Sequence, residues 1–360
     1  MSMTAEQFDN KLIEVAKKKG IPLWGKFELT GRCNLKCKMC YVRKEARDKE
    51  IIKLERTAAE WIKLAEEAKA EGLLYLLFTG GEVFLRPDFK EIYEAVSLMG
   101  FSISIYTNAT LITAEIANWL GKIPPSLIEV TLYGASPETY EEVTGDFNAY
   151  DKAVMGIDLL KAEGINIQIR TTVVKSNKAD IFKIIEFAEH RDIQFGIVDY
   201  ISPRRDGTDN CLGEERLTPE EVMALNINLE NYYRNKSDEI LKEAISDEKD
   251  DLNGKPSDND TPFPCGGGNC WFWVTWDGRM TPCGLMEDLA TFPFNIGLEK
   301  AWKDLKKKSL SIPRCRECTN CDLKEFCLTC PARLKNETGY YDRPAPYLCS
   351  LAEKLRDNLS

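Results

Sequence analysis

Three cysteines lie close together near the N-terminus, in the stretch Cys33-Asn-Leu-Lys-Cys37-Lys-Met-Cys40. Thiolates are the usual protein ligands of iron–sulfur clusters, and a 4Fe–4S cluster has four iron corners. Three cysteines would leave one corner open, and an open metal position allows another molecule to bind. The spacing is too tight for three separate helices or strands. We therefore expect a loop that wraps around the metal, with Gly31 providing the turn before it.

Two other uses of cysteine compete with this interpretation. A structural zinc site needs four ligands, commonly two Cys-x2-Cys pairs, and the next cysteine along the chain is the distant Cys211. A disulfide framework is typical of small secreted proteins, and a chain of 360 residues is far larger than those. The spacing therefore favours an iron–sulfur cluster.

The composition is that of a globular protein with a substantial core. Hydrophobic residues make up 43% of the chain, and the formal net charge is −10. A negative charge argues against broad binding to nucleic acid, because the phosphate backbone repels it. No stretch is apolar enough to span a membrane, and residues 1–10 lack the regions of a signal peptide. We therefore expect a cytoplasmic protein without a membrane partner.

The chain has thirteen cysteines and one histidine, His190. In a reducing compartment, so many cysteines indicate metal binding rather than disulfides. A single histidine nearly excludes imidazole acid–base chemistry and histidine-rich metal sites. His190 ends a helical pattern, so we expect it at a helix end or on the surface.

Short apolar segments alternate with helical patterns, and this alternation predicts βα units around a parallel sheet. Six strands are too few for a full eight-stranded barrel. We therefore predict an α/β fold, a partial (β/α)6 TIM-like barrel with its functional residues at the carboxyl ends of the strands. The predicted strands cover 27–30, 73–79, 101–107, 127–132, 165–173 and 193–199, and the predicted helices cover 4–19, 57–71, 88–99, 113–121, 149–163 and 178–190.

Polar residues follow several predicted strands, at the edge where the cysteine loop also lies. The turn Thr79-Gly80-Gly81-Glu82 follows the second strand, where the glycines let the backbone approach a ligand. Glu82 offers a carboxylate that suits a ligand ammonium group. The polar residues of the later strands could face a ligand or be satisfied core and turn residues. These are Thr107, Asn108, Thr131 and Arg170.

The chain divides into four predicted parts. We expect an N-terminal helical extension over 1–25, the barrel over 26–202, a helical and acidic linker over 203–262, and a small C-terminal domain over 263–360. Arg204 and Arg205 open the linker, and a helix is predicted over 218–246. Both a mobile connection and a flap that covers the substrate fit its composition.

The C-terminal module holds nine of the thirteen cysteines, enough for two four-ligand metal centres with one cysteine left over. The aromatic run from Trp271 to Trp276, followed by Asp277-Gly278, predicts a β-hairpin. We expect the aromatic residues to form the hairpin core rather than a surface that stacks on nucleic acid. The nine cysteines are Cys265, Cys270, Cys283, Cys315, Cys318, Cys321, Cys327, Cys330 and Cys349.

Three of these patterns together resemble the radical S-adenosylmethionine (SAM) enzymes with a C-terminal SPASM domain. The cysteine loop is similar to the cluster loop of that superfamily, and Gly80-Gly81-Glu82 is similar to its motif for the methionine amine of SAM. The C-terminal cysteine spacing is similar to that of the SPASM domain. The resemblance extends over residues 26–350.

This resemblance implies that Cys33, Cys37 and Cys40 hold a 4Fe–4S cluster that binds SAM, and that one electron then releases a 5′-deoxyadenosyl radical. It also implies two auxiliary 4Fe–4S clusters, three clusters in all. The residues expected to contact SAM are Tyr41, Gly80, Gly81, Glu82, Asn108, Thr131 and Arg170, with Met39 and Val42 beside the adenine. The implied auxiliary ligands are Cys265, Cys270, Cys283 and Cys330 for one cluster, and Cys318, Cys321, Cys327 and Cys349 for the other.

The sequence departs from the family pattern at three places. Two residues rather than three separate Cys327 from Cys330, and Cys315 is surplus and could replace Cys318 as a ligand. In anaerobic sulfatase maturases the cysteine after the hairpin turn precedes a catalytic aspartate. Here that cysteine, Cys283, is followed by Gly284.

The resemblance implies an enzyme that abstracts hydrogen from a peptide or protein and leaves a crosslinked or oxidised residue. Ferredoxin or flavodoxin would supply the electron. Residues 1–25 are too few for a winged-helix leader-binding domain, so a separate leader-peptide-binding protein is a further possible partner. A sulfatase-type maturase that makes formylglycine is the first alternative. A non-catalytic iron–sulfur or zinc scaffold, or an electron carrier, is the alternative from another class, and it leaves the barrel unexplained.

Overall fold

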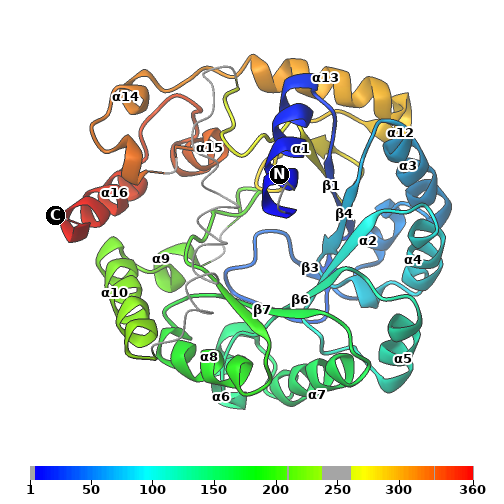
Figure 1. Ribbon diagram of the computed structural model, residues 1–360, viewed down its shortest axis with the longest axis horizontal. Coiled ribbons are helices and arrows are strands. Elements are labelled where there is room, and N and C mark those ends of the chain that lie inside the picture. Colours follow the sequence, from blue (N-terminus) through cyan, green and yellow to red (C-terminus); the bar gives the residue numbers. More distant parts are fainter. Residues whose placement is uncertain (1–4, 209–210, 237–260, 328, 360) are drawn as a thin grey trace.

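The computed structural model describes residues 5–208, 211–236, 261–327 and 329–359. Six strands of one sheet run parallel and alternate with helices around a ring (Figure 1). The predicted partial (β/α)6 barrel is therefore confirmed. Its strands are β1 (Trp24–Thr30), β4 (Tyr75–Gly80), β5 (Ser102–Thr107), β6 (Leu127–Thr131), β7 (Ile167–Thr172) and β8 (Gln194–Val198).

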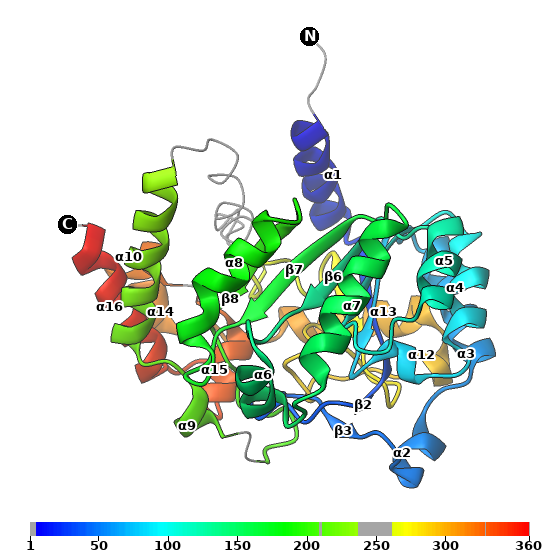
Figure 2. The same cartoon turned by 90° about the horizontal axis from the view of Figure 1, so that it is seen from below.

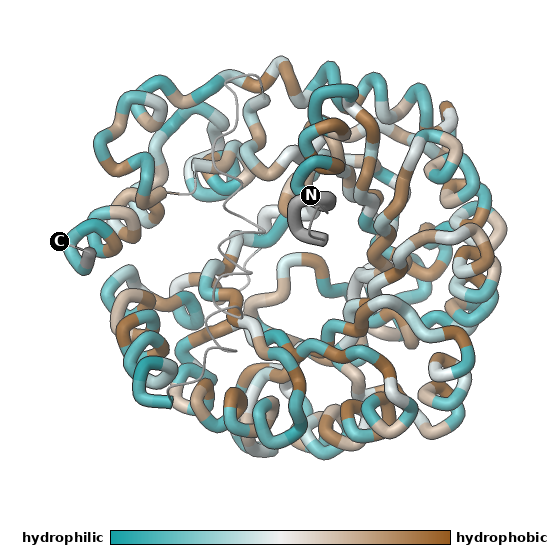
Figure 3. The backbone as a smooth tube through the Cα atoms, in the orientation of Figure 1, coloured by the Kyte–Doolittle hydropathy of each residue, from teal (hydrophilic) through white to brown (hydrophobic). Residues whose placement is uncertain are grey.

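The barrel helices form where apolar residues recur at helical spacing. In α4 the buried residues are Phe89, Ile92, Tyr93 and Val96, the spacing of one apolar helix face. Hydrophobic and hydrophilic segments alternate along the helices of the ring (Figure 3). The predicted helices are confirmed as α1 (Ala5–Lys19), α3 (Ala58–Ala70), α4 (Phe89–Ser97), α5 (Ala114–Lys122), α7 (Ala149–Ala162) and α8 (Ile181–Glu189). The pattern missed the short helices α2 (Lys49–Leu54) and α6 (Pro137–Thr144) and the 3-10 turns η1 (Val83–Leu85) and η2 (Lys178–Asp180).

Residues alternate along each strand between the helix layer and the barrel interior. In β1, Phe27 and Leu29 join the main hydrophobic core with the helices. Their neighbours Lys26 and Glu28 face the interior instead. The interior-facing positions in the middle of β1 are therefore charged.

The C-terminal module adds its hairpin to the barrel sheet. The predicted hairpin is confirmed as β9 (Trp271–Val274) and β10 (Met280–Thr281), which pair antiparallel. Strand β9 also pairs parallel with β1, with Trp24 opposite Trp271. The sheet order is β10-β9-β1-β4-β5-β6-β7-β8, so the sheet runs from the barrel into the module. Phe272, Trp273 and Trp276 are buried, as expected for hairpin core.

Helices complete the ring on the side that six strands leave open. Helix α10 (Pro219–Lys236) packs against α16 (Pro346–Leu359), and the two lie side by side in both views (Figures 1 and 2). The rest of the helix predicted over 218–246 and the acidic stretch of the linker lie largely outside the described residues. The remaining elements are β2 (Arg32–Cys33), β3 (Lys44–Glu45), α9 (Leu212–Glu215), α12 (Pro293–Ile296), α13 (Leu298–Leu310), α14 (Arg316–Thr319), η3 (Lys324–Phe326) and α15 (Pro331–Thr338).

The fold also bears on the predictions for His190 and for membrane-spanning segments. His190 is exposed at the C-terminal end of α8, where a helix-end role was predicted. Within the described residues, none of the helices combines the length and the apolar character that crossing a membrane requires.

A buried ion pair joins three parts of the chain. The Glu28 side chain, on β1, is fully buried, and Arg205 donates one hydrogen bond of 2.9 Å to each of its carboxylate oxygens. The Trp273 indole N–H donates to Glu28 Oε1 at 2.7 Å. Arg205 also donates to the backbone oxygen of Gly284 at 2.9 Å. The start of the predicted linker is therefore anchored to the barrel and the hairpin, not a free connection.

Removing one partner of this ion pair should destabilise the fold strongly. We expect Arg205→Met to lower the free energy of unfolding by about 3–5 kcal/mol, because it leaves the Glu28 carboxylate buried without its counter-charge. Urea unfolding of the cofactor-free protein measures this difference. The double variant Glu28→Gln with Arg205→Met should be less destabilised than the single Arg205 variant.

The control for this prediction is Arg191→Met. Arg191 pairs with Asp158, whose side chain is 51% exposed, so its loss should cost less than about 1 kcal/mol. Equal effects of the Arg191 and Arg205 variants would contradict the structural role assigned to the buried pair.

Candidate functional site

The cysteine loop leaves the carboxyl end of β1 and closes on itself. The Lys44 N–H donates to the Gly31 oxygen at 2.7 Å, and β2 pairs with β3 at the two ends of the loop. Inside the loop, the Cys40 N–H donates to the Cys37 oxygen at 3.3 Å, and the Leu35 N–H donates to Cys33 Sγ at 3.4 Å. The sequence therefore folds into the wrapped loop that the spacing predicted.

The three thiols share a buried environment. Cys37 is buried, and Cys33 and Cys40 are half-buried. Burial raises the pKa of Cys33 to about 12, with a further contribution from Glu82. Burial also raises the pKa of Cys37 well above its usual value, and Cys40 and Cys33 raise it further. Positive metal charge would reverse this penalty, because a coordinating thiol is deprotonated by the metal.

The separation between the three thiols bears on the kind of metal group that the loop could bind. Within the described residues, no three Cys, His, Asp or Glu side chains converge closely enough to hold one metal ion. A 4Fe–4S cluster distributes its ligands over separate iron corners, so its thiolates do not meet at one point. The donor set of Cys33, Cys37 and Cys40 on one closed loop suits such a cluster.

Gly31 lies at a bend before the loop, as predicted, although its backbone is not left-handed. A Cβ atom at Gly31 would lie 2.8 Å from Nε1 of Trp276. Gly31 is therefore required because the hairpin of the C-terminal module packs directly against the start of the cysteine loop.

Gly80 and Gly81, at the end of β4, also allow two backbone segments to pack closely. A Cβ atom at Gly80 would lie 2.2 Å from the Thr30 oxygen, and one at Gly81 would lie 2.1 Å from the Arg32 oxygen. The Gly81 N–H donates to the Thr30 oxygen at 2.7 Å, and the Glu82 N–H donates to the Arg32 oxygen at 2.9 Å. Gly80 and Gly81 thus hold the β4 turn against the cysteine loop.

The Glu82 carboxylate is a brace inside the site. The side chain is fully buried and accepts hydrogen bonds from the Phe84 N–H, the Thr107 hydroxyl and the Asn108 N–H at 3.1, 2.8 and 2.8 Å. Burial raises the pKa of Glu82 to about 6, against the opposing effect of these three hydrogen bonds. The three protein donors fix the position of the carboxylate, and its contact with a ligand ammonium group stays a prediction.

Asn108 connects the β4 turn to the cysteine loop. Its backbone N–H binds Glu82, while its side-chain Nδ2 lies 3.1 Å from Asn34 Oδ1 and 3.7 Å from Cys33 Sγ. Asn34 in turn donates to the Thr110 hydroxyl at 2.8 Å. The structure therefore brings Cys33, Glu82 and Asn108 into one hydrogen-bonded group.

The other predicted SAM contacts lie around the interior rather than in that group. Arg170 and Thr131 are register partners on β7 and β6, and Arg170 pairs with Glu129 at 2.8 Å. Tyr41 is half-buried, with the Arg205 guanidinium 5.9 Å from its ring centre. Met39 and Val42 are buried. Met39 packs in the main hydrophobic core, which is the alternative to a contact with the adenine of SAM.

The first group of C-terminal cysteines surrounds a small hydrophobic cluster. Cys265, Cys283 and Cys330 all pack against it. Burial raises the pKa of Cys283 to about 12, with further contributions from Cys330 and Cys265. Cys270, the fourth cysteine of this implied set, is buried in a different cluster, with Ala16 and Leu23. The structure thus brings three of the four together and places Cys270 at their edge.

The second group contains all four implied ligands and the surplus cysteine. Burial raises the pKa of Cys318 to about 12, with contributions from Cys315, Cys327 and Cys349. Burial also raises the pKa of Cys349, to which Cys321 and Cys315 contribute. Cys318, Cys321, Cys327 and Cys349 therefore neighbour one another, and Cys315 lies among them.

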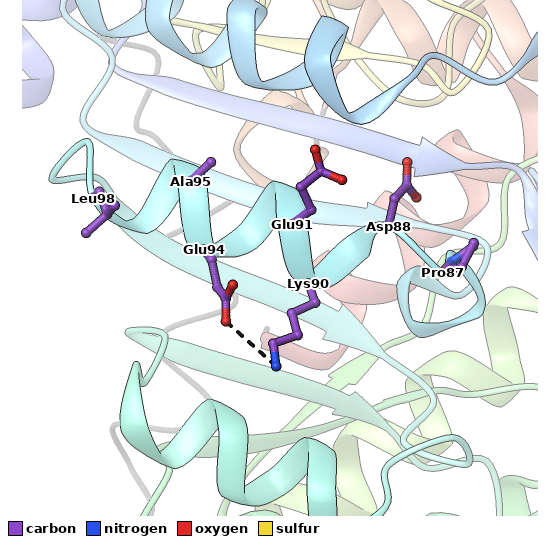
Figure 4. A pocket seen from close by; sticks show the side chains of 7 residues that line it. All are labelled: Pro87, Asp88, Lys90, Glu91, Glu94, Ala95 and Leu98. Carbon is purple, nitrogen blue, oxygen red and sulfur yellow. Dashed lines mark ion pairs between the residues drawn. The ribbon is translucent and has the colours of Figure 1, made fainter.

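A hollow on the outer side of the barrel lies apart from these groups (Figure 4). Lys90 and Glu94 form an ion pair across one helix turn there, at 3.9 Å. No cysteine contributes to this hollow, so it does not belong to the site. Its lining residues are Pro87, Asp88, Lys90, Glu91, Glu94, Ala95 and Leu98.

Sequence reasoning missed Glu28, Asn34 and Thr110 as parts of the site. A signal for Glu28 was present, because a charged residue between Phe27 and Leu29 in a predicted strand must face away from the helix layer. Asn34 and Thr110 carried no comparable signal, since single polar residues in loops are common.

The residues of the barrel match a known family. Residues 27–188, which include the cysteine loop and Gly80-Gly81-Glu82, match the Radical SAM superfamily. The chain therefore contains a Radical SAM domain over these residues, and it is an enzyme. The members of that family use a 4Fe–4S cluster and SAM. A similar protein is the AdoMet-dependent heme synthase of Methanosarcina barkeri, which is 27% identical over 337 residues, 89% of this chain and 94% of that protein.

Two solved structures share the fold over nearly the whole chain. Streptococcus suis SuiB bound to S-adenosylmethionine has a TM-score of 0.71 at 18% identity, covering 94% of this chain and 82% of that one. Native anSMEcpe with bound AdoMet has a TM-score of 0.70 at 18% identity, covering 93% and 96%. The matches extend through the C-terminal module, and the predicted assignment to radical SAM enzymes with a SPASM domain is confirmed.

The brace role of Glu82 generates a prediction about stability. We expect Glu82→Gln to lower the free energy of unfolding by about 1–3 kcal/mol, because an amide NH2 group would face donors that now bind a carboxylate oxygen. Denaturant unfolding of the cofactor-free protein measures this effect without involving catalysis.

Glu66→Gln is the matched control, because Glu66 is an exposed residue of α3 and its substitution should change stability by less than about 0.5 kcal/mol. If the Glu82 and Glu66 variants unfolded alike, the carboxylate would not be the brace described here.

Proposed function

We propose that this enzyme modifies a peptide or protein side chain by radical chemistry. It would reductively cleave SAM and abstract hydrogen from the substrate, leaving a crosslinked or oxidised residue. The observation that supports a peptide substrate is the shared fold, because SuiB has also been solved with its precursor peptide SuiA and anSMEcpe with a Cys-containing peptide.

In this proposal, Cys33, Cys37 and Cys40 hold the 4Fe–4S cluster. The bound cluster and SAM together supply the electron and the 5′-deoxyadenosyl radical. The protein orients SAM with the backbone of Gly80 and Gly81, with Asn108 and with Thr131 and Arg170 on the opposite strands, while Tyr41 closes the loop side. Glu82, held in place by its three protein donors, would bind the methionine amine of SAM and also fixes the backbone of Asn108.

We further propose two auxiliary 4Fe–4S clusters in the C-terminal module. Their support is that Cys265, Cys283 and Cys330 pack against one hydrophobic cluster, while Cys315 and Cys318 share another with Leu348, which precedes Cys349. Ferredoxin or flavodoxin would reduce the clusters, and a separate protein could present a leader peptide. The thirteen thiols are all free in the structure, which favours the reducing cytoplasm as the place of action.

A tetrapyrrole is the second candidate substrate. The specific observation in its favour is the M. barkeri heme synthase, which this chain matches over 94% of its length at an identity well above that of the fold neighbours. Both candidates use the same radical generator, so the difference lies in what the barrel interior accepts.

Formylglycine formation is disfavoured by the packing around Gly284. A Cβ atom at this position would lie 2.7 Å from the Trp273 ring, and the Gly284 oxygen accepts a hydrogen bond from Arg205. An aspartate in this position, as in the sulfatase maturases, would clash with Trp273. The chain lacks both the catalytic carboxylate and the space for it.

Replacing Cys33, Cys37 and Cys40 together by alanine should abolish SAM cleavage and leave about eight iron atoms in the C-terminal module. The physical reason is that only the loop cysteines leave an iron corner open for SAM. Reconstituted protein is assayed for 5′-deoxyadenosine with dithionite, and its iron is counted. Retained cleavage would refute the role of the loop, and a loss of all iron would refute the auxiliary clusters.

Incubation of the enzyme with each candidate substrate tests whether it acts on a peptide or on a tetrapyrrole. We expect peptides encoded by short reading frames beside this gene to stimulate 5′-deoxyadenosine formation and to lose hydrogen, seen as a mass decrease. Iron coproporphyrin III serves as the tetrapyrrole probe under identical conditions. A mass change of the porphyrin, with peptides unchanged, would replace the peptide proposal by the tetrapyrrole one.

A further inference from the structure

Two helices bring positive charge together on one part of the surface. Helix α1 ends in three consecutive lysines, and α13 carries three more near its end. The Trp302 indole N–H of α13 donates to the Gly20 oxygen at 2.9 Å, so the end of α1 packs on α13 (Figure 1). A Cβ atom at Gly20 would overlap the Lys306 ammonium group, which therefore reaches the end of α1. We call these six residues the lysine patch: Lys17, Lys18, Lys19, Lys306, Lys307 and Lys308.

The lysine patch faces solvent and has no acidic neighbour to balance it. Lys17 and Lys306 are half-buried, and the other four lysines are exposed. Within the described residues, no acidic side chain forms an ion pair with any of the six, whereas Lys303 of α13 pairs with Glu299. The chain as a whole has a formal net charge of −10. Six adjacent lysines without an acidic partner are therefore an exception on this surface.

The ordinary role of lysine at a helix end accounts for only part of this charge. A cation in the last turn stabilises a helix by interacting with its dipole. The barrel helices α5 and α7 each have one lysine in the last turn, Lys122 and Lys161. Helix α1 has three, and Lys306 reaches the same end from α13. Like charges held together repel one another, so the patch lowers stability unless an anionic partner compensates for it.

The lysine patch contacts a segment that begins and ends with cysteines of the first auxiliary set, residues 265–270. Asn269 Nδ2 donates to the Lys17 oxygen at 3.0 Å. A Cβ atom at Gly268 would overlap Ser309 Oγ, at the end of α13. The segment is therefore clasped between the lysine-bearing ends of both helices. A protein bound to the patch would lie beside this cysteine segment.

We propose that the lysine patch is the docking surface for the electron donor, a small acidic protein of the ferredoxin type. Carboxylates on the donor would pair with the exposed lysines and bring its redox group close to segment 265–270, where a short distance favours electron transfer. One electron leaves the reduced ferredoxin and enters the enzyme, and no bond forms or breaks in this transfer. The electron transfer rests on the proposed function, whereas the docking rests on the charge of the patch.

The test compares a protein donor with a small-molecule donor in two charge-reversed variants. The patch variant combines Lys18→Glu, Lys19→Glu and Lys307→Glu. The control variant, whose net charge changes equally, combines Lys122→Glu, Lys152→Glu and Lys161→Glu. The control lysines are also exposed, and they lie on α5 and α7, across the ring from α13 (Figure 1). Circular dichroism checks that both variants are folded.

Reduced ferredoxin should support 5′-deoxyadenosine formation about tenfold more slowly in the patch variant than in the parent or the control variant at low salt. The reason is that complementary charge speeds the association of proteins about 10- to 1,000-fold. Dithionite needs no docking surface and should support equal rates in all three proteins.

Binding of ferredoxin to the cofactor-free protein provides a second readout that does not involve catalysis. Isothermal titration calorimetry should show that the affinity falls about tenfold in the patch variant and is unchanged in the control variant. Added salt should weaken binding to the parent, because ions screen exposed charges.

Two results would overturn the proposal. Equal ferredoxin affinity and equal ferredoxin-dependent rates in the patch and control variants would show that the donor docks elsewhere. A patch variant that is folded and binds ferredoxin normally, but loses peptide-stimulated turnover with dithionite, would show that the patch binds an acidic substrate peptide instead. If dithionite supported no SAM cleavage in the parent, the proposed function would fail, and the calorimetry would still decide whether the patch binds ferredoxin.

Discussion

The buried Glu28 carboxylate is the interaction on which the arrangement of this enzyme depends. It accepts two hydrogen bonds from Arg205 and one from the Trp273 indole, and the Trp276 N–H lies 3.4 Å from it. A charge with no exposure must be compensated by its surroundings, so this residue requires all of these partners at once. Barrel, linker and hairpin are thereby held in one geometry.

That geometry places the cysteine loop directly against the C-terminal module. Gly31 has room only for a hydrogen because Trp276 packs on it, and Arg204 donates to the Cys40 oxygen at 3.0 Å. A second junction closes the ring, where Arg216 pairs with Glu337 at 2.6 Å and lies 3.4 Å from the centre of the Tyr347 ring. The barrel with its cysteine loop and the C-terminal module are thus joined on both sides of the ring.

The buried residues of the site hold one another in position. Gly80 and Gly81 allow backbone contact with the loop, and Glu82 fixes Asn108 through its backbone N–H. Arg170 and Glu129 pair on the neighbouring strands β7 and β6. The fold by itself does not determine the substrate, because one fold serves many reactions.

The sequence by itself determined the elements whose signals are local. The spacing of Cys33, Cys37 and Cys40 predicted the wrapped loop, and the alternation of apolar segments identified the six barrel strands, because side-chain periodicity acts over a few residues. Only the tertiary structure decided which distant segments meet. It paired β9 with β1, surrounded Glu82 with three protein donors, packed Gly31 against Trp276 and placed Cys315 beside Cys318. These outcomes depend on burial and on partners far along the chain, and no short stretch of sequence encodes them.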